Sequence, residues 1–282
     1  MGRLRDTKIL KPPTNYSGSK DKLLPQLVEY FPNKENVNNF YDVFCGGLSV
    51  TINTEYNKII ANDIIEPLIH FYQILYDAAN SNKVESEIQN LQKAKIDKDS
   101  KEDFLNVRLS FNKTRDPYLF FALVSSCTNN MMRFNKKFEF NQSFGKRTIN
   151  LNTVQKIRDY CEVMIEKDIL FTSMNFDELL KIYPPGKNDF VYLDPPYGFI
   201  TEAGYNAYWG KENEAKLFDT IDDLNEKGIK FALSGVSIHK GKENPNMDRI
   251  NKYKVIELDH SYEKVARKKN AGKSQEILVL NY

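Results

Sequence analysis

The sequence predicts an α/β fold in which a Rossmann-like, mostly parallel sheet carries helices on both faces. Its second half alternates strand-like and helix-like stretches, and its first half holds two further β-prone runs, 40–45 and 58–62. Strands that alternate with helices favour parallel pairing under covering helices. The strand-like stretches of the second half are 168–172, 188–193, 229–234, 253–258 and 275–281. Ligands of such sheets bind beyond the carboxyl ends of the strands.

The helices are predicted from the spacing of apolar side chains. Residues 19–30 and 66–79 carry apolar residues at helical spacing, and each predicts an amphipathic helix. Charges of both signs dominate from about 81 to 115, which indicates a solvated helix surface or a variable insert. The apolar residues 117–128 predict a buried helix. Further helical patterns separate the later strands at 150–166, 175–183 and 212–227.

Composition is typical of a globular chain with one or two domains. The 282 residues are 41% hydrophobic and 12% aromatic, which suffices for a sizeable core. The formal net charge is only +2, so any basic surface for nucleic acid must be local. We expect a monomer, because no interface pattern stands out.

Cysteine and histidine usage predicts neither disulfides nor a metal site. Cys45, Cys127 and Cys161 are widely spaced and form no C-x-x-C pair. The three histidines are scattered singly, so we expect no metal. No run approaches the ~18 apolar residues that span a membrane, and the amino terminus lacks the apolar core of a secretory signal. These features predict a cytoplasmic protein without a membrane segment.

One short stretch carries most of the chemistry. The apolar run 190–193 leads directly into Asp194, Pro195, Pro196 and Tyr197. The prolines fix a stiff corner, and Asp194 is biased toward an extended conformation because it precedes a proline. The Asp194 carboxylate and the Pro195 carbonyl are then two acceptors beside an aromatic ring, which suits a nucleobase with an exocyclic amine. Taken alone, Asp-Pro-Pro is also ordinary turn chemistry.

A glycine turn upstream predicts a nucleoside-containing cofactor. The run 40–45 ends in Gly46 and Gly47, and Asp63 follows Gly46 by 17 residues at the end of the next strand-like run. Rossmann-like folds hold ribose hydroxyls with an acid in this place. Asp63 alone could instead cap the following helix. The full G-x-G-x-x-G pattern is absent, which disfavours a nicotinamide or flavin enzyme.

The basic segment 133–141, near the middle of the chain, predicts a hairpin with Asn135 and Lys136 near its tip. Residues 130–147 contain five Lys or Arg residues and one acidic residue, which gives a local net charge of +4. Such a hairpin suits a DNA groove, although composition alone favours a merely solvated hairpin. A second basic run, 264–273, and a ring-rich stretch, 197–209, are candidates for a phosphate contact and for a loop over an extruded base.

These segments together resemble the Dam-like, D12 class of DNA adenine-N6 methyltransferases over nearly the whole chain. The resemblance rests on 15–20 (Asn-Tyr-Ser-Gly-Ser-Lys), on 44–47 with Asp63, on 129–145 and on the Asp-Pro-Pro-Tyr motif. The motif order, cofactor motifs first and catalytic motif last, is the alpha type. The run 131–135 with the later Trp-Gly is similar to modification enzymes of GATATC-type systems. Many members have a third glycine where this chain has Leu48.

The resemblance implies a site and a division of the chain. It implies methyl transfer from S-adenosyl-L-methionine to N6 of a flipped adenine in double-stranded DNA, with a cognate restriction endonuclease as a candidate partner. Residues 1–64 and 150–282 would form the catalytic domain, and 65–149 a small, mainly helical DNA-recognition domain that carries the β-hairpin. The implied catalytic residues are Asp194, Pro195, Pro196 and Tyr197. The implied cofactor residues are Tyr16, Lys20, Phe44, Gly46, Gly47, Asp63, Phe176 and Asp194. Phe176 could equally be a core ring. The implied DNA contacts are Asn129, Arg133, Asn135, Lys136 and Lys137.

Three alternatives stay open at this point. The first is a methyltransferase that acts on N4 of cytosine or on adenine in RNA. The second is a catalytically silent DNA-binding subunit of a restriction or phage-defence system, which the intact motif at 194–197 disfavours. The third is a nucleotide-dependent oxidoreductase, which the incomplete glycine pattern and the basic hairpin disfavour.

Overall fold

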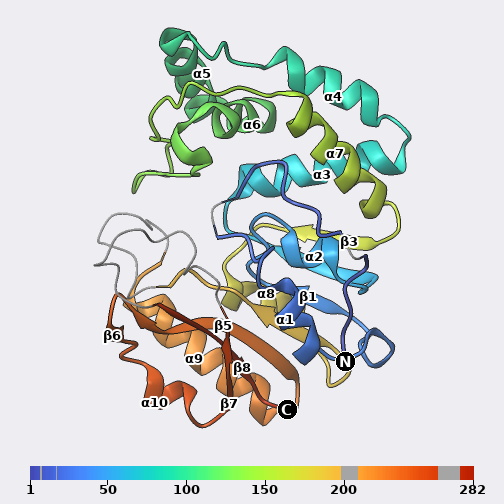
Figure 1. Cartoon of the computed structure of the whole chain (residues 1–282), viewed down its shortest axis with the longest axis vertical. Coiled ribbons are helices and arrows are strands. Elements are labelled where there is room, and N and C mark those ends of the chain that lie inside the picture. The colour runs from blue at the N-terminus through green and yellow to red at the C-terminus, as the bar shows by residue number, and fades with distance from the viewer. Residues whose placement is uncertain (7, 17, 198–208, 260–273) are drawn as a thin grey trace.

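The computed structural model of the chain describes residues 1–6, 8–16, 18–197, 209–259 and 274–282. Within these residues eight strands form one sheet in the order β3-β2-β1-β4-β5-β8-β7, and β6 pairs with the end of β5 (Figure 1). The strands are β1 (Phe40–Asp42), β2 (Lys58–Asn62), β3 (Asp168–Thr172), β4 (Phe190–Leu193), β5 (Lys230–His239), β6 (Lys242–Glu243), β7 (Lys254–Leu258) and β8 (Gln275–Leu280).

The sheet is parallel except at β6 and β8. Strands β3, β2, β1, β4 and β5 pair in parallel, whereas β8 is antiparallel to both of its neighbours, β5 and β7. The reversed β8 therefore brings its amino end to the edge where the parallel strands end. This mixed α/β sheet flanked by helices confirms the predicted Rossmann-like class.

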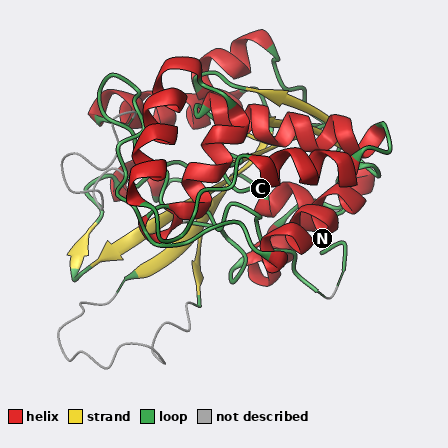
Figure 2. Cartoon of the chain, turned by 90° about the horizontal axis from the view of Figure 1, so that it is seen from above, coloured by secondary structure: helices red, strands yellow, loops and turns green. Residues whose placement is uncertain are grey.

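Helices cover both faces of the sheet, and seen from above they overlie most of it (Figure 2). They are α1 (Leu24–Tyr30), α2 (Ser49–Asn53), α3 (Glu66–Asn80), α4 (Val84–Lys93), α5 (Lys101–Thr114), α6 (Pro117–Ser126), α7 (Leu151–Met164), α8 (Phe176–Ile182), α9 (Lys211–Glu226) and α10 (Met247–Ile250). Short 3-10 turns lie at η1 (Lys34–Asn36) and η2 (Thr128–Asn130). No described helix is long and apolar enough to cross a membrane.

Two apolar clusters, one on each face, hold the sheet between the helices. Because side chains alternate along a strand, Phe190 and Tyr192 of β4 join the cluster shared with α1, α2, α3 and α7. Val191 and Leu193 join the opposite cluster with α8, α9 and α10. The continuous apolar run before Asp194 is thus a fully buried central strand, as its sequence indicates.

Helices α4, α5 and α6 form a layer beyond α3 and α7, farthest from β5 and β8 (Figure 1). Asp116 caps α6 by accepting the amides of Tyr118 and Leu119, and Ser100 caps α5 by accepting the amide of Asp103. The rings of Phe71 on α3 and Phe121 on α6 stack 4.4 Å apart. One apolar cluster therefore runs from the sheet into this helical layer, and the division at 65 and 149 stays a prediction.

Several element boundaries differ from those predicted. The first strand ends at Asp42 rather than 45, because the chain leaves the sheet into the glycine turn. The first helix begins at Leu24 rather than 19. The charged stretch 81–115 folds into α4 and α5, each with buried apolar residues.

The expected hairpin forms, but as a tight turn rather than a ladder of strands. An isolated bridge joins Phe134 to Phe140, and a second joins Cys127 to Phe144. The amide of Asn135 donates to the Glu139 carbonyl at 2.9 Å, which closes the turn. The tip is therefore 136–138, one residue beyond the predicted position.

Candidate active site

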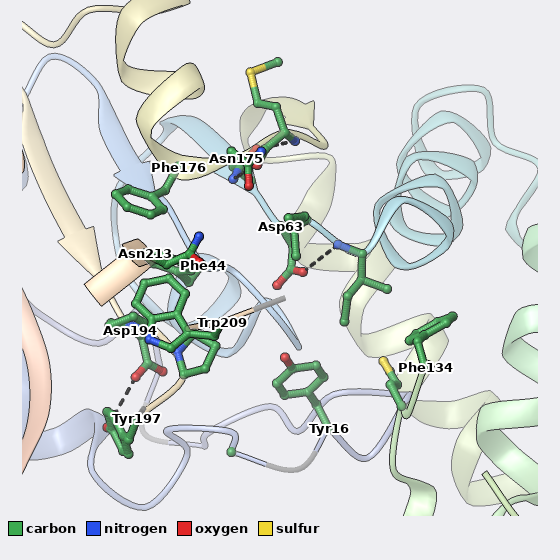
Figure 3. A pocket seen from close by; sticks show the side chains of 18 of the residues that line it. Tyr16, Phe44, Asp63, Phe134, Asn175, Phe176, Asp194, Tyr197, Trp209 and Asn213 are labelled. Atoms are coloured by element: carbon green, nitrogen blue, oxygen red, sulfur yellow. Dashed lines mark hydrogen bonds between the residues drawn. The ribbon is translucent and has the colours of Figure 1, made fainter. Parts of the chain in front are cut away.

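A cavity of about 440 Å³ opens at the carboxyl edge of the parallel strands (Figure 3). Its walls come from the turns after β1, β2, β3 and β4, from the loop before α1 and from the base of the hairpin. It is lined by Tyr16, Gly18, Lys20, Phe44, Asn62, Asp63, Ile64, Ile65, Met131, Met132, Phe134, Met174, Asn175, Phe176, Asp194, Pro195, Pro196, Tyr197, Trp209 and Asn213. Most of the predicted catalytic and cofactor residues meet here.

Asp194 lies directly after β4, where the two prolines turn the chain into the cavity. Its Oδ1 atom lies 2.7 Å from the Lys20 ammonium, which is only 9% exposed as a residue. The Tyr197 hydroxyl donates to the same Oδ1 atom at 3.4 Å (Figure 3). The Lys20 Nζ atom also lies 5.4 Å from the centre of the Tyr197 ring. The loop before α1 and the turn after β4 thus form one charged group.

The glycine turn after β1 leaves room for Tyr16. Gly46 adopts a φ of +45°, and a Cβ atom there would lie 2.8 Å from the Tyr16 ring. A Cβ atom on Gly47 would lie 2.7 Å from Pro12 and 2.8 Å from Tyr16 Cβ. Both positions therefore require glycine, the first for backbone conformation as well as space. Gly46 and Gly47 act by admitting Tyr16, since neither lines the cavity itself.

Leu48, which stands where the resemblance leads us to expect a third glycine, also has left-handed backbone angles, φ 58° and ψ 20°. The side chain is fully buried, so the apolar contact offsets a conformation that costs roughly 1–2 kcal/mol for a residue with a Cβ atom. The backbone path of the turn is therefore the one that glycine would favour, although the residue differs.

Asp63 joins the ends of β1 and β2. Its Oδ2 atom accepts the Gly46 amide at 3.1 Å, and its Oδ1 atom accepts the Ile65 amide at 2.9 Å just before α3. Burial raises the pKa of its carboxyl above the ordinary value, and the two amides oppose that rise. Asp63 therefore holds the residue before α3 and lines the cavity as well. The capping alternative is wrong, because the N-cap of α3 is Ile65 and no side chain caps this helix. A carboxylate has about four acceptor positions, so two amides leave capacity for further donors.

Asn62 is a structural residue that the sequence reasoning missed. Its Nδ2 atom donates to the carbonyls of Val43 at 3.0 Å and Met174 at 3.1 Å. Its Oδ1 atom accepts the Met174 amide at 3.1 Å and the Thr172 hydroxyl at 3.0 Å. One buried amide thus fixes the ends of three neighbouring strands. Its place beside Asp63 at a strand end was the available signal.

Three aromatic rings form one wall of the cavity. The ring centres of Phe44 and Phe176 lie 5.5 Å apart, and Trp209 lies 5.6 Å from Phe44 and 5.7 Å from Phe176. Phe176 is 4% exposed, so it is both a core ring and a cavity wall. Trp209, which stands before α9, was expected in a loop over the extruded base, and the structure places its ring in this wall. Its indole Nε1 atom is buried and has no hydrogen-bond partner among the described residues.

The predicted DNA contacts lie on the hairpin, beside the cavity. Arg133, Lys136 and Lys137 are exposed, and Asn129 has a left-handed φ of 57° within η2. Asn135 uses its side chain inside the turn: it donates to the Glu139 carboxylate at 2.8 Å and accepts the Lys137 amide at 2.8 Å. All five remain predicted DNA contacts.

The hairpin has two faces. Met132 and Phe134 line the cavity, while Arg133 between them is exposed. The hairpin therefore forms part of the same pocket that holds Asp63 and Asp194, which the spacing of its residues in the sequence did not indicate. The ring-rich residues Phe199, Tyr205 and Tyr208 and the basic run 264–273 lie outside the described residues.

Two further acids approach the site. Asp42, at the end of β1, is buried and accepts the Thr51 hydroxyl at 2.7 Å; burial raises the pKa of its carboxyl to about 7. Glu276, at the start of β8, accepts the Tyr197 hydroxyl at 3.2 Å, and burial raises the pKa of its carboxyl while Lys20 lowers it. The described residues contain no group of three or more His, Cys, Asp or Glu side chains arranged for a metal ion.

The fold and this cavity define a Rossmann-like α/β protein with a pocket beside an Asp-Pro-Pro-Tyr corner at the carboxyl edge of its parallel strands. The model of the D12 class N6 adenine-specific DNA methyltransferase family matches residues 16–266, and the chain belongs to that family. The predicted family is confirmed, whereas the finer likeness to GATATC-type enzymes stays a prediction.

Several relatives are modification enzymes. The chain is 35% identical over its whole length to the type II methyltransferase M.FokI of Planomicrobium okeanokoites, covering 44% of that protein. It is 34% identical over 98% of its length to the modification methylase StsI of Streptococcus sanguinis, covering 43% of it. It is 26% identical to the type II methyltransferase M1.LlaDCHI of Lactococcus lactis subsp. cremoris, covering 99% of that protein. The chain thus spans less than half of the first two relatives.

Proposed function

We propose that this chain transfers a methyl group from S-adenosyl-L-methionine to N6 of an adenine that is turned out of double-stranded DNA. The observation that carries the proposal is the meeting of two motifs in one cavity. Asp194 and Tyr197 of one motif and Asp63 of the other all line it, together with the wall of three rings. One cavity can therefore hold both reactants side by side.

The lining residues fit the cofactor. A volume of about 440 Å³ lies in the usual range for a small-molecule site. Asp63 has acceptor capacity for ribose hydroxyls, and Phe44, Phe176 and Trp209 offer an aromatic wall to the adenine ring. The buried Nε1–H of Trp209, unpartnered within the described part of the chain, is a donor for a ring nitrogen. Tyr16 and Lys20 would lie at the methionine end.

The chain's own residues would hold and polarise the target amine. When bound, the cofactor supplies an electrophilic methyl group on a positively charged sulfur. Asp194 and the Pro195 carbonyl would accept hydrogen bonds from the N6 amine, and Tyr197 would stack on the extruded base. As positive charge develops on the nitrogen, the Asp194 carboxylate stabilises it. Holding both reactants in line supplies much of the rate.

The hairpin would bring the DNA to this cavity. The exposed Arg133, Lys136 and Lys137 would contact phosphates and base edges, and extrusion of the base is needed because N6 is buried in the duplex. The relatives named above are type II or modification methylases, so we propose a cognate restriction endonuclease as a partner in the cytoplasm. We propose a monomeric enzyme.

The test is incubation with tritiated S-adenosyl-L-methionine and unmethylated DNA, followed by nucleoside analysis and methylation-aware sequencing. We expect label in N6-methyladenine at one recurring short sequence. Label in N4-methylcytosine, label only in RNA, or no label on any duplex would overturn the proposal. Asp194→Ala provides the inactive control for contaminating methylases.

A further inference from the structure

Glu276 is a largely buried carboxylate that the proposed reaction leaves without a role. It is the second residue of β8, where it pairs with Val236 on β5 and with Leu258 on β7. Because β8 runs against β5, its amino end lies at the edge where β4 and β5 end. This reversal places the Glu276 side chain beside the Asp-Pro-Pro-Tyr corner.

The Tyr197 hydroxyl lies between two carboxylates. It approaches Glu276 Oε2 at 3.2 Å and Asp194 Oδ1 at 3.4 Å. A hydroxyl has a single proton to donate, so it cannot serve both acceptors fully. The shorter of the two contacts is the one to Glu276. Asp194 Oδ1 has a second and closer donor, the Lys20 ammonium at 2.7 Å.

We propose that Glu276 is a positioning residue for methyl transfer, which acts through the Tyr197 hydroxyl; this inference rests on the proposed function. By attracting the hydroxyl, Glu276 keeps it from competing with the target amine for Asp194. The same contact fixes the plane of the ring on which the extruded base stacks. Without Glu276, the Tyr197 hydroxyl turns to Asp194, the other of the two carboxylates. The Tyr197 ring and the Asp194 carboxylate are then both displaced from their reacting positions.

This role predicts a particular kinetic signature. An interaction that aligns the amine chiefly in the transition state changes the rate at saturation more than the binding of substrate. Misplacement of a reacting group by about 1 Å can cost on the order of 100-fold in rate. We therefore expect a loss in kcat for Glu276 variants without a matching rise in the KM for the cofactor.

The experiment is a double-mutant cycle measured by single-turnover methylation at saturating cofactor and DNA. Glu276→Ala and Glu276→Met, which fills the space without an acceptor, should each lower the rate on the order of 10- to 100-fold. Glu276→Gln keeps an acceptor oxygen and should recover most of the rate. In a Tyr197→Phe background, Glu276→Ala should cause no further loss, because the contact is already absent. If the double variant shows the product of the rate losses caused by Glu276→Ala and by Tyr197→Phe, the proposal is overturned.

A second readout needs no methyl transfer. In a duplex with 2-aminopurine in place of the target adenine, fluorescence rises on extrusion and is quenched by stacking, so Glu276→Ala should give a brighter complex than the wild type. Glu257→Ala, at an exposed carboxylate of β7, is the matched control, and thermal unfolding verifies each fold. Wild-type rate and fluorescence in Glu276→Ala would overturn the role of Glu276. Absence of methylation by the wild type would overturn the proposed function instead.

Discussion

At the scale of single residues, Asp194 should contribute both to catalysis and, through its contact with Lys20, to the stability of the fold. Asp194→Ala should reduce methyl transfer by at least on the order of 100-fold, because the acceptor that we propose stabilises the developing charge is lost. It should also lower the free energy of unfolding, since it leaves the nearly buried Lys20 ammonium without the carboxylate at 2.7 Å.

Adding Lys20→Met to Asp194→Ala should restore stability while the enzyme stays inactive. Chemical unfolding and turnover, measured on both variants, separate the two effects. Near-normal turnover in Asp194→Ala would remove this residue from the catalytic site.

Asp63 is the residue on which cofactor affinity should depend most. Its two oxygens already accept the amides of Gly46 and Ile65, so its orientation is fixed before any ligand binds. Asp63→Ala should weaken binding of S-adenosyl-L-methionine on the order of 10- to 100-fold, the value of one or two hydrogen bonds to a charged group. Isothermal titration calorimetry measures this, with Asp177→Ala, an acid at the start of α8 outside the cavity, as control. An unchanged affinity would place the ribose elsewhere.

At the scale of elements, the end of β1 predicts how stability depends on pH. Burial raises the pKa of the Asp42 carboxyl from 3.8 to about 7, despite the hydrogen bond from Thr51. The folded state therefore binds a proton that the unfolded chain has released between these values. The contribution is fully present below about pH 3.8 and is lost as the pH rises through about 7.

Asp42→Asn should remove this dependence. Relative to the variant, the wild type should lose unfolding free energy between pH 4 and pH 8, by an amount on the order of a few kcal/mol. Urea unfolding at several pH values tests this. A constant difference between the two proteins would show that Asp42 is ionised in the folded state throughout.

The elements that the sequence predicted correctly are those with strong local signals. The run 190–193 is apolar at every position, and β4 is a central strand buried on both faces. Gly46, Gly47 and Asp63 follow strands, and parallel topology brings them to one edge. The residues that tertiary packing brings to the site could not be predicted from such local signals. Met132, Phe134 and Glu276 reach the site because distant segments pack together, and Glu276 begins a strand rather than ending one.

At the scale of the whole molecule, the hairpin proposed to contact DNA also lines the cavity proposed for methyl transfer. Arg133 is exposed on a hairpin whose other face lines the cavity. Arg133→Ala should relax the sequence preference of methylation, whereas Lys137→Ala should weaken binding nearly equally on all DNA and lower the salt dependence. Methylation-aware sequencing and binding at several salt concentrations distinguish them. A uniform loss on every sequence in Arg133→Ala would identify it as a phosphate contact.

The reversed strand β8 has a consequence for when activity can appear. Lys20, Tyr197 and Glu276 come from three distant stretches of the chain, and the contact between Tyr197 and Glu276 exists only once β8 has inserted between β5 and β7. Contacts of such high sequence separation form slowly, because the intervening loops must be closed first. On the proposed role of Glu276, a newly made or partly unfolded chain can therefore hold a nearly native sheet and still methylate more slowly, so that full activity reports the docking of β8.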